Sequence, residues 1–121
     1  MNVVRAEENG IVIFTLDGRV DTEGAVDLDL ALQTAVSEGE YRLILDMQEV
    51  SYLNSAGLRT LADILQTAQK NGGNLYLAGL NRKILRVLQI IGFDKFFEIF
   101  DDVELAARAY FLVPSPNGDG I

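Results

Sequence analysis

A serine at the expected start of a helix is the residue of this chain best placed for chemistry. Ser55 follows Asn54 and precedes apolar residues with the i, i+3, i+4, i+7 spacing of an amphipathic helix, namely Leu58, Leu61, Ala62, Leu65 and Ala68. The first amides of a helix have no partners within it, and its amino end carries a partial positive charge. A phosphate attached to the hydroxyl of Ser55 would therefore be accommodated there.

The same residues also have ordinary structural roles. Asn or Ser at the start of a helix commonly caps its free amides, so capping is the alternative role of Ser55. Arg59 lies one turn further on, on the same face, and its side chain leans back toward the amino end, within reach of such a phosphate. Asp63, four residues beyond Arg59, offers it an ion pair instead. The spacing alone leaves these alternatives open.

A strand and a loop are expected to position Ser55. Leu43, Ile44 and Leu45 form a short apolar run that is bounded by Asp46, which is typical of a buried strand. We expect this strand to be followed by a loop that leads to Asn54. Upstream, β-rich segments at 3–6 and 11–16 flank Asn9-Gly10, and this pattern predicts an antiparallel hairpin.

Helices and further short strands are expected on both sides of this stretch. Asp21 or Thr22 would cap a helix running to about residue 37, and residues 75–78 would form a buried strand. Asn81 would cap a helix that ends at Gly92. A short strand near Glu98 is expected to bury some of Phe93, Phe96, Phe97 and Phe100 in the core. Asp101 with Glu104 resembles a capping box opening a last helix.

This element order predicts an α/β fold. Strands alternate with helices from residue 11 to residue 80, which implies right-handed crossovers and a mainly parallel sheet, with the first strand added antiparallel at one side. The expected order is β-β-α-β-α-β-α-(β)-α, with about four or five strands and about four helices. We expect one domain over residues 1–112, and residues 113–121 have the composition of a disordered tail.

Composition excludes several classes of function. The chain has no Cys and no His, which removes thiolate or imidazole metal sites and Ser-His acyl transfer, so we expect no catalytic residue, metal or cofactor. Its formal net charge of −8 argues against binding to nucleic acid or anionic lipid. No apolar stretch is long enough to span a membrane, and the amino terminus does not resemble a secretory signal. We therefore expect a cytoplasmic protein.

The central stretch resembles a known signature. The segment LILDMQEVSYLNSAGLRTL, residues 43–61, is similar to the signature of STAS domains, in particular the bacterial anti-sigma factor antagonists. Further matches are Gly18-Arg19-Val20-Asp21, Asn71-Gly72-Gly73-Asn74-Leu75, Ile91-Gly92-Phe93 and Phe96-Phe97-Glu98-Ile99-Phe100. Together they cover roughly residues 3–112, and the expected element order is also the one that the resemblance implies.

The resemblance implies a switch controlled by phosphorylation. The position that is phosphorylated in the family falls on Ser55, while Asn54 replaces the family's usual Asp, which keeps a capping oxygen but removes a negative charge. The implied partner is an anti-sigma factor that is also a serine protein kinase: the unmodified domain captures it and frees a sigma factor, phosphorylation of Ser55 reverses this, and a phosphatase resets the cycle. The candidate partner-binding residues are Asp21, Asn54, Ser55, Ala56, Gly57, Leu58, Arg59 and Ala62.

Some of these positions have competing roles. Leu58 and Ala62 also fit the core, and Asp21 also fits a helix cap. The loop after Val20 and the loop that holds Ser55 should lie side by side, because the carboxyl ends of parallel strands share one edge of a sheet. Asp21 would then face Ser55.

Two other functions remain as alternatives. One is a scaffold or subunit with a STAS fold in a signalling or transport assembly, in which Ser55 only caps its helix. The other is nucleotide binding at the same loops, although the sequence contains no glycine-rich phosphate-binding motif. We expect a monomer or a weak dimer.

Overall fold

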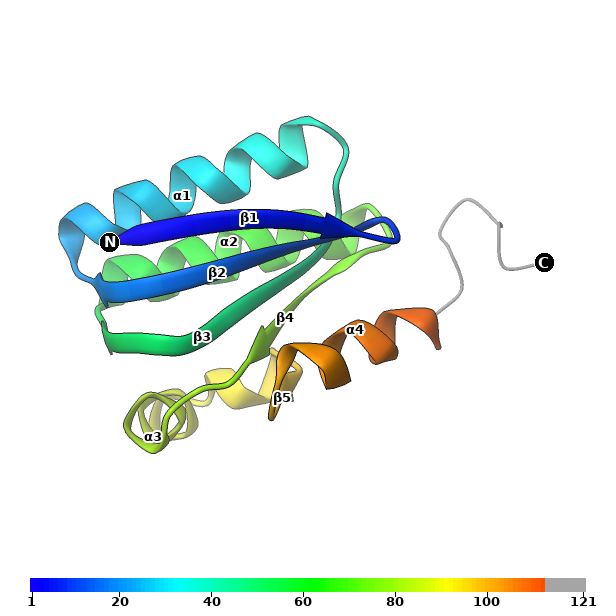
Figure 1. Ribbon diagram of the computed structural model, residues 1–121. Coiled ribbons are helices and arrows are strands. Elements are labelled where there is room, and N and C mark those ends of the chain that lie inside the picture. The colour runs from blue at the N-terminus through cyan, green and yellow to red at the C-terminus, as the bar shows by residue number, and fades with distance from the viewer. Residues whose placement is uncertain (113–121) are drawn as a thin grey trace.

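A five-stranded mixed sheet with four α-helices forms the fold, as Figure 1 shows for the computed structural model, which describes residues 1–112. The strand order in the sheet is β1-β2-β3-β4-β5; β1 is antiparallel to β2, and the other neighbours are parallel. The predicted fold class is confirmed. The elements are β1 (Asn2–Glu8), β2 (Ile11–Val20), α1 (Thr22–Ser37), β3 (Arg42–Leu53), α2 (Ser55–Lys70), β4 (Asn74–Ala78), α3 (Arg82–Ile91), a short 3-10 helix η1 (Phe93–Lys95), β5 (Ile99–Phe100) and α4 (Val103–Phe111).

The predicted hairpin between β1 and β2 is confirmed. Asn9 and Gly10 both have positive φ, 53° and 80°, which is the backbone of a two-residue turn of type I′. The two strands pair from Asn2 opposite Asp17 to Glu8 opposite Ile11.

The central strands are covered on both faces. Side chains alternate along a strand, so Leu43 and Leu45 point into the core beneath α1 and α2, whereas Ile44 points toward α4. Burial on both faces explains why this strand begins as an uninterrupted apolar run. In Figure 1, α1 and α2 lie along one face of the sheet and α4 lies on the other.

Tyr110 fastens α4 to the sheet. Its hydroxyl accepts a hydrogen bond from the amide of Leu43 at 3.0 Å and lies 2.7 Å from the carbonyl oxygen of Leu43 and 2.8 Å from that of Asn74. Its ring stacks on Tyr76, with the ring centroids 4.1 Å apart. Burial raises the pKa of Tyr110 far above its ordinary value, so the hydroxyl stays neutral.

The loop that we expected before Asn54 is instead strand. The strand β3 continues through Leu53 and pairs with the second half of β2 up to Val20 opposite Leu53. Met47 and Val50 are buried along this extension, but two exposed polar residues lie between them, so the sequence does not show the regular alternation of apolar and polar residues that is typical of a strand. Asn54 therefore directly follows the end of a long strand.

The expected start of the last helix was wrong by one residue. The cap of α4 is Asp102, whose carboxylate accepts from the amide of Leu105 at 2.8 Å, and not Asp101. The expectation that some of the four phenylalanines are buried is confirmed: Phe97 is buried, Phe93 and Phe100 are partly buried against the core clusters, and Phe96 is 66% exposed. The short strand near Glu98 is present as β5. The expected tail at residues 113–121 lies outside the described residues.

Candidate functional site at the starts of helices α1 and α2

Ser55 is the first residue of α2, and its neighbour Asn54 does the capping. The side-chain oxygen of Asn54 accepts a hydrogen bond from the amide of Gly57 at 2.9 Å. Ser55 is exposed, and within the described part of the chain its hydroxyl has no hydrogen-bond partner. The hydroxyl thus lies free at the positive end of a 16-residue helix.

The start of α1 lies beside the start of α2. The amide of Asn54 donates to the carbonyl oxygen of Val20 at 3.0 Å, which joins the two strand ends. Asp21 follows Val20 and caps α1, accepting from the amide of Gly24 at 2.9 Å. The predicted proximity of the two loops is confirmed, and Asp21 has the capping role that was its alternative.

Two glycines allow these helix starts to approach the strand ends closely. A Cβ at Gly57 would lie 2.6 Å from the side chain of Val20 and 2.7 Å from that of Leu53. A Cβ at Gly24 would lie 2.3 Å from the carbonyl oxygen of Arg19. Gly24, although unfavourable within a helix, is therefore required by the packing of α1 onto the end of β2.

The predicted site residues differ in accessibility. Ser55, Ala56 and Arg59 are exposed, and Gly57 is buried. Partial burial is shared by Asp21, Asn54, Leu58 and Ala62, and Leu58 packs against the main core. Among residues 1–112, Arg59 makes no ion pair with Asp63, so its guanidinium is available to another group.

Two hollows flank the loop that carries Ser55, and sequence reasoning missed most of the residues that line them. One, of about 250 Å³, lies between α1 and α2 and is lined by Thr22, Ala25, Val26, Asp29, Ala56 and Thr60. The other, of about 110 Å³, lies between the end of β3 and α3 and is lined by Ser51, Tyr52, Leu53, Lys83, Ile84 and Val87. The shared strand edge predicted α1 as a neighbour, and the same rule applied to β4 would also have indicated the start of α3.

Arg19 and Tyr52 add an ordered cation beside the second hollow. The guanidinium carbon of Arg19 lies 4.3 Å from the centre of the Tyr52 ring, in the geometry of a cation–π contact. The two residues are register partners on β2 and β3, so the sheet itself holds them together.

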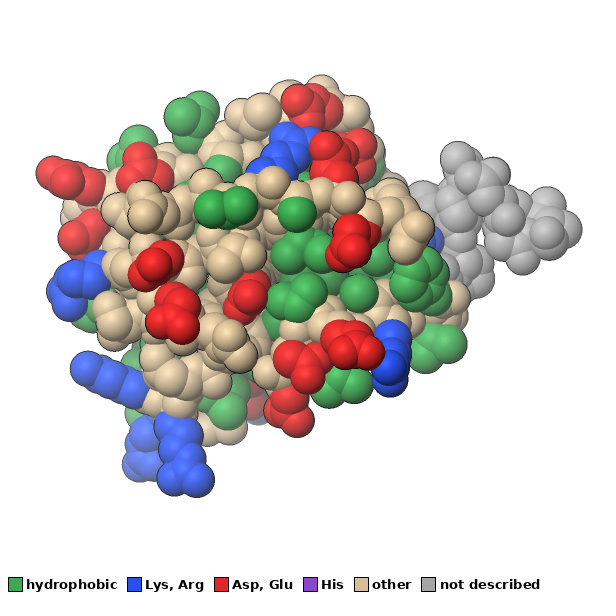
Figure 2. Space-filling model, viewed as in Figure 1, with side chains coloured by type: hydrophobic (Ala, Val, Ile, Leu, Met, Phe, Trp, Pro, Cys, Tyr) green, Lys and Arg blue, Asp and Glu red, His purple; other side chains and the backbone are tan. Residues whose placement is uncertain are grey.

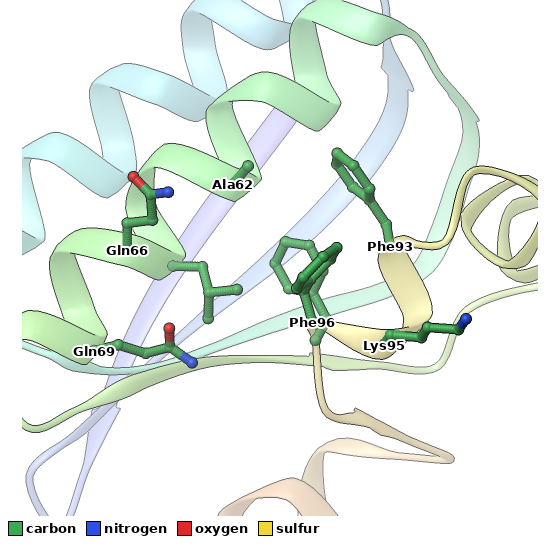
Figure 3. Close-up of a pocket in the computed structure, with 8 residues that line it drawn as sticks. Ala62, Gln66, Gln69, Phe93, Lys95 and Phe96 are labelled. Atoms are coloured by element: carbon green, nitrogen blue, oxygen red, sulfur yellow. The ribbon is translucent and has the colours of Figure 1, made fainter.

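A larger hollow of about 490 Å³ lies elsewhere, between α2 and η1. Figure 3 shows Phe93, Lys95 and Phe96 on the η1 side, opposite Ala62, Gln66 and Gln69 of α2. Of the predicted site residues only Ala62 lines it.

The described residues contain no group of three or more Asp, Glu, His or Cys side chains arranged to hold a metal ion. Among these same residues, no helix is both long and apolar enough to cross a membrane. What the site does offer is a free hydroxyl on a helix dipole, with exposed side chains around it that a protein partner could contact.

The fold and the site define a class of protein: an α/β domain with an exposed serine at the start of the helix that follows a central strand. Comparison with known proteins identifies the family. The family model named STAS domain matches residues 2–106, so the chain belongs to the STAS domain family. It is 31% identical over 110 residues to BtrV of Bordetella bronchiseptica, which is named as an anti-sigma factor antagonist; the match covers 91% of this chain and 95% of BtrV.

Solved structures share the fold. The chain is similar to the crystal structure of TM1081 from Thermotoga maritima, also named as an anti-sigma factor antagonist, with a TM-score of 0.84, 21% identity, and 88% of this chain and 92% of that one covered. It is also similar to SpoIIAA of Bacillus in its phosphorylated form, with a TM-score of 0.71, 16% identity and coverage of 89% and 99%.

Proposed function

We propose that this protein is an anti-sigma factor antagonist that is switched by phosphorylation of Ser55. The unmodified form binds an anti-sigma factor that is also a serine kinase, and a sigma factor is released; phosphorylation ends the complex, and a phosphatase restores it. The names of its relatives support the function of an anti-sigma factor antagonist. The observation that carries the switch is the free, exposed hydroxyl of Ser55 at a helix start that Asn54 already caps.

Because of the position of Ser55, phosphorylation should change the stability of the folded domain little. A phosphate adds a charge of about −1.5 to −2 near neutral pH. The amino end of α2 offsets part of this by roughly 0.3 to 1 kcal/mol, and water hydrates the remainder because the residue is exposed. The free domain should therefore fold equally well in both states.

The same charge should be costly in a complex. A mismatched charge buried at an interface costs on the order of 2 to 5 kcal/mol, which is about thirty-fold or more in affinity. Phosphorylation then controls binding, and the partner surface surrounds Ser55. In this proposal the surface comprises Asp21, Asn54, Ala56, Gly57, Leu58, Arg59 and Ala62, with the exposed Ala56 and Arg59 as its most accessible members.

The direct test is phosphate transfer to one residue. The purified chain is incubated with ATP and with the ATPase-type anti-sigma kinase encoded nearest to its gene, and intact mass is measured. We expect one added phosphate on the wild type and none on Ser55→Ala, with Ser51→Ala as a matched control because Ser51 is also exposed nearby. Phosphate on another residue, or binding without any transfer, would instead favour a scaffold in which Ser55 has no switching role.

A further inference from the structure

The outer face of α1 carries a stripe that is both acidic and apolar. Glu23, Val26, Asp27 and Leu30 are spaced i, i+3, i+4 and i+7, and all four side chains are exposed, Val26 by 65% and Leu30 by 68%. The helix contains no Lys or Arg. Val26 and Leu30 lie one turn apart, so they form a small exposed apolar patch between two carboxylates that a complementary surface could cover.

The outer face of α3 carries the oppositely charged counterpart. Lys83, Arg86, Val87 and Ile90 have the same i, i+3, i+4 and i+7 spacing; all are exposed, Ile90 by 73%, and the helix has no Asp or Glu. Among residues 1–112, neither basic side chain takes part in an ion pair. Figure 2 shows Lys and Arg side chains gathered at the lower left, where Figure 1 places α3.

We propose that these two stripes bind each other between two copies of the chain, α1 of one copy running parallel to α3 of the other. When two helical faces meet, the i+3 position of one lies opposite the i+4 position of the other, because the facing surfaces are reversed left to right. Val26 then meets Val87, and Asp27 meets Arg86. At the two ends of the stripe, Glu23 meets Lys83 and Leu30 meets Ile90.

The register and direction of the contact follow from the same positions. In the antiparallel arrangement Glu23 would lie against Ile90, and Lys83 would lie against Leu30, which would bury charges on apolar side chains. Only the parallel arrangement places every charge opposite its counter-charge and every apolar side chain opposite another. The complementarity extends over two turns of each helix.

A second copy fits this surface better than an anionic membrane or a nucleic acid does. The acidic stripe on α1 and the basic stripe on α3 are both present in every copy of the chain. The formal net charge of −8, in contrast, repels polyanions such as nucleic acid. The same net charge opposes the approach of two copies, and a single helix pair buries little area, so the contact is weak and forms at high protein concentration. It gives a closed pair if both copies exchange both contacts, and a chain of copies otherwise.

Both stripes border the loop that carries Ser55. Val26 lines the hollow between α1 and α2, and Val87 and Lys83 line the hollow between β3 and α3. Self-association would therefore cover the flanks of that loop and compete with a partner bound there. This consequence rests on the proposed function; the contact between copies does not.

A charge-exchange experiment tests the contact. Sedimentation equilibrium over a wide range of protein concentration gives the average mass of wild type, Glu23→Lys/Asp27→Lys and Lys83→Glu/Arg86→Glu. We expect the mass of the wild type to rise with concentration and each double variant to remain monomeric. An equimolar mixture of the two variants should associate again, because each α1–α3 contact then regains opposite charges.

A matched control separates this contact from effects of net charge. Lys70→Glu/Arg108→Glu makes the same charge change as Lys83→Glu/Arg86→Glu, but on exposed residues outside the stripes, so it should associate as the wild type does. A monomeric wild type at every concentration, association of either stripe variant alone, or a mixture that stays monomeric would each overturn the proposal. Ser55→Ala should associate to the same extent as the wild type, so that the result does not depend on phosphorylation.

Discussion

Capping and the proposed phosphorylation are divided between two adjacent residues at the start of α2. Asn54 satisfies the amide of Gly57, and Ser55 keeps a free hydroxyl one position later. In the family pattern Asp occupies the place of Asn54, and either residue supplies the oxygen that caps a helix. The substitution therefore leaves the geometry around Ser55 intact and changes only the charge next to it.

The division predicts different outcomes for stability and binding at Ser55. Ser55→Asp places a negative charge at the positive end of α2 and removes no hydrogen bond, so the melting temperature should stay within a few degrees of the wild type. Affinity for the anti-sigma factor should fall by about thirty-fold or more. Differential scanning calorimetry and titration calorimetry measure the two quantities. An unfolded Ser55→Asp domain, or one that binds at full affinity, contradicts the mechanism.

Asn54 should be the residue whose loss destabilises this helix start. Asn54→Ala removes the cap and should lower the free energy of unfolding by about 1 kcal/mol, whereas Asn54→Asp should retain it. Urea denaturation followed by circular dichroism measures both, with Ser55→Ala as the control that should be nearly neutral. If Ser55→Ala were the more destabilising change, the assignment of the cap would be wrong.

At the scale of elements, the attachment of α4 depends on a hydroxyl that must remain neutral. Tyr110 reaches backbone groups of both β3 and β4, and its pKa is raised, first by burial. Tyr76, stacked on it, also has a raised pKa, first through burial and then through Glu98. A raised pKa means that the unfolded chain loses these protons before the folded chain does.

Stability should therefore fall as the pH rises above about 10, where tyrosine ionises in the unfolded state. Tyr110→Phe removes one of the two tyrosines whose pKa is raised, so the free energy of unfolding of the variant should decline less steeply over that range. At neutral pH the variant should be less stable by about 1 to 3 kcal/mol, because Tyr110 bonds to buried backbone. Urea titrations at a series of pH values measure both effects, and identical slopes for the two proteins would show that Tyr110 ionises normally.

Element boundaries show what the sequence could predict and what it could not. The hairpin, the cap at Asn81 and the end of α3 at Gly92 are local signals, so the sequence predicts them. The cap of α2 is local too, but the sequence leaves it open between Asn54 and Ser55. The second half of β3 was missed because its strand character depends on pairing with β2, which local periodicity does not report. The cap of α4 was missed by one residue, since two adjacent aspartates offer the same oxygen.

At the scale of the whole molecule, topology brings the site together. The rule that parallel strands share a carboxyl edge predicted that the starts of α1 and α2 would be neighbours, and the bond from Asn54 to Val20 confirms it. The hollow formed with α3 was not predicted, although the same rule applied to β4 indicates that the start of α3 lies at this edge. The roles of the individual site residues stay a prediction.

The hydrogen bond from the amide of Asn54 to the carbonyl oxygen of Val20 makes the two helix starts one mechanical unit. Gly57, which sits against Val20 and Leu53 with no room for a methyl group, reinforces this linkage from the other side. A force that tilts α2 is thus passed to the end of β2 and on to Asp21. A partner that binds beside Ser55 and displaces α2 should therefore displace the start of α1 as well.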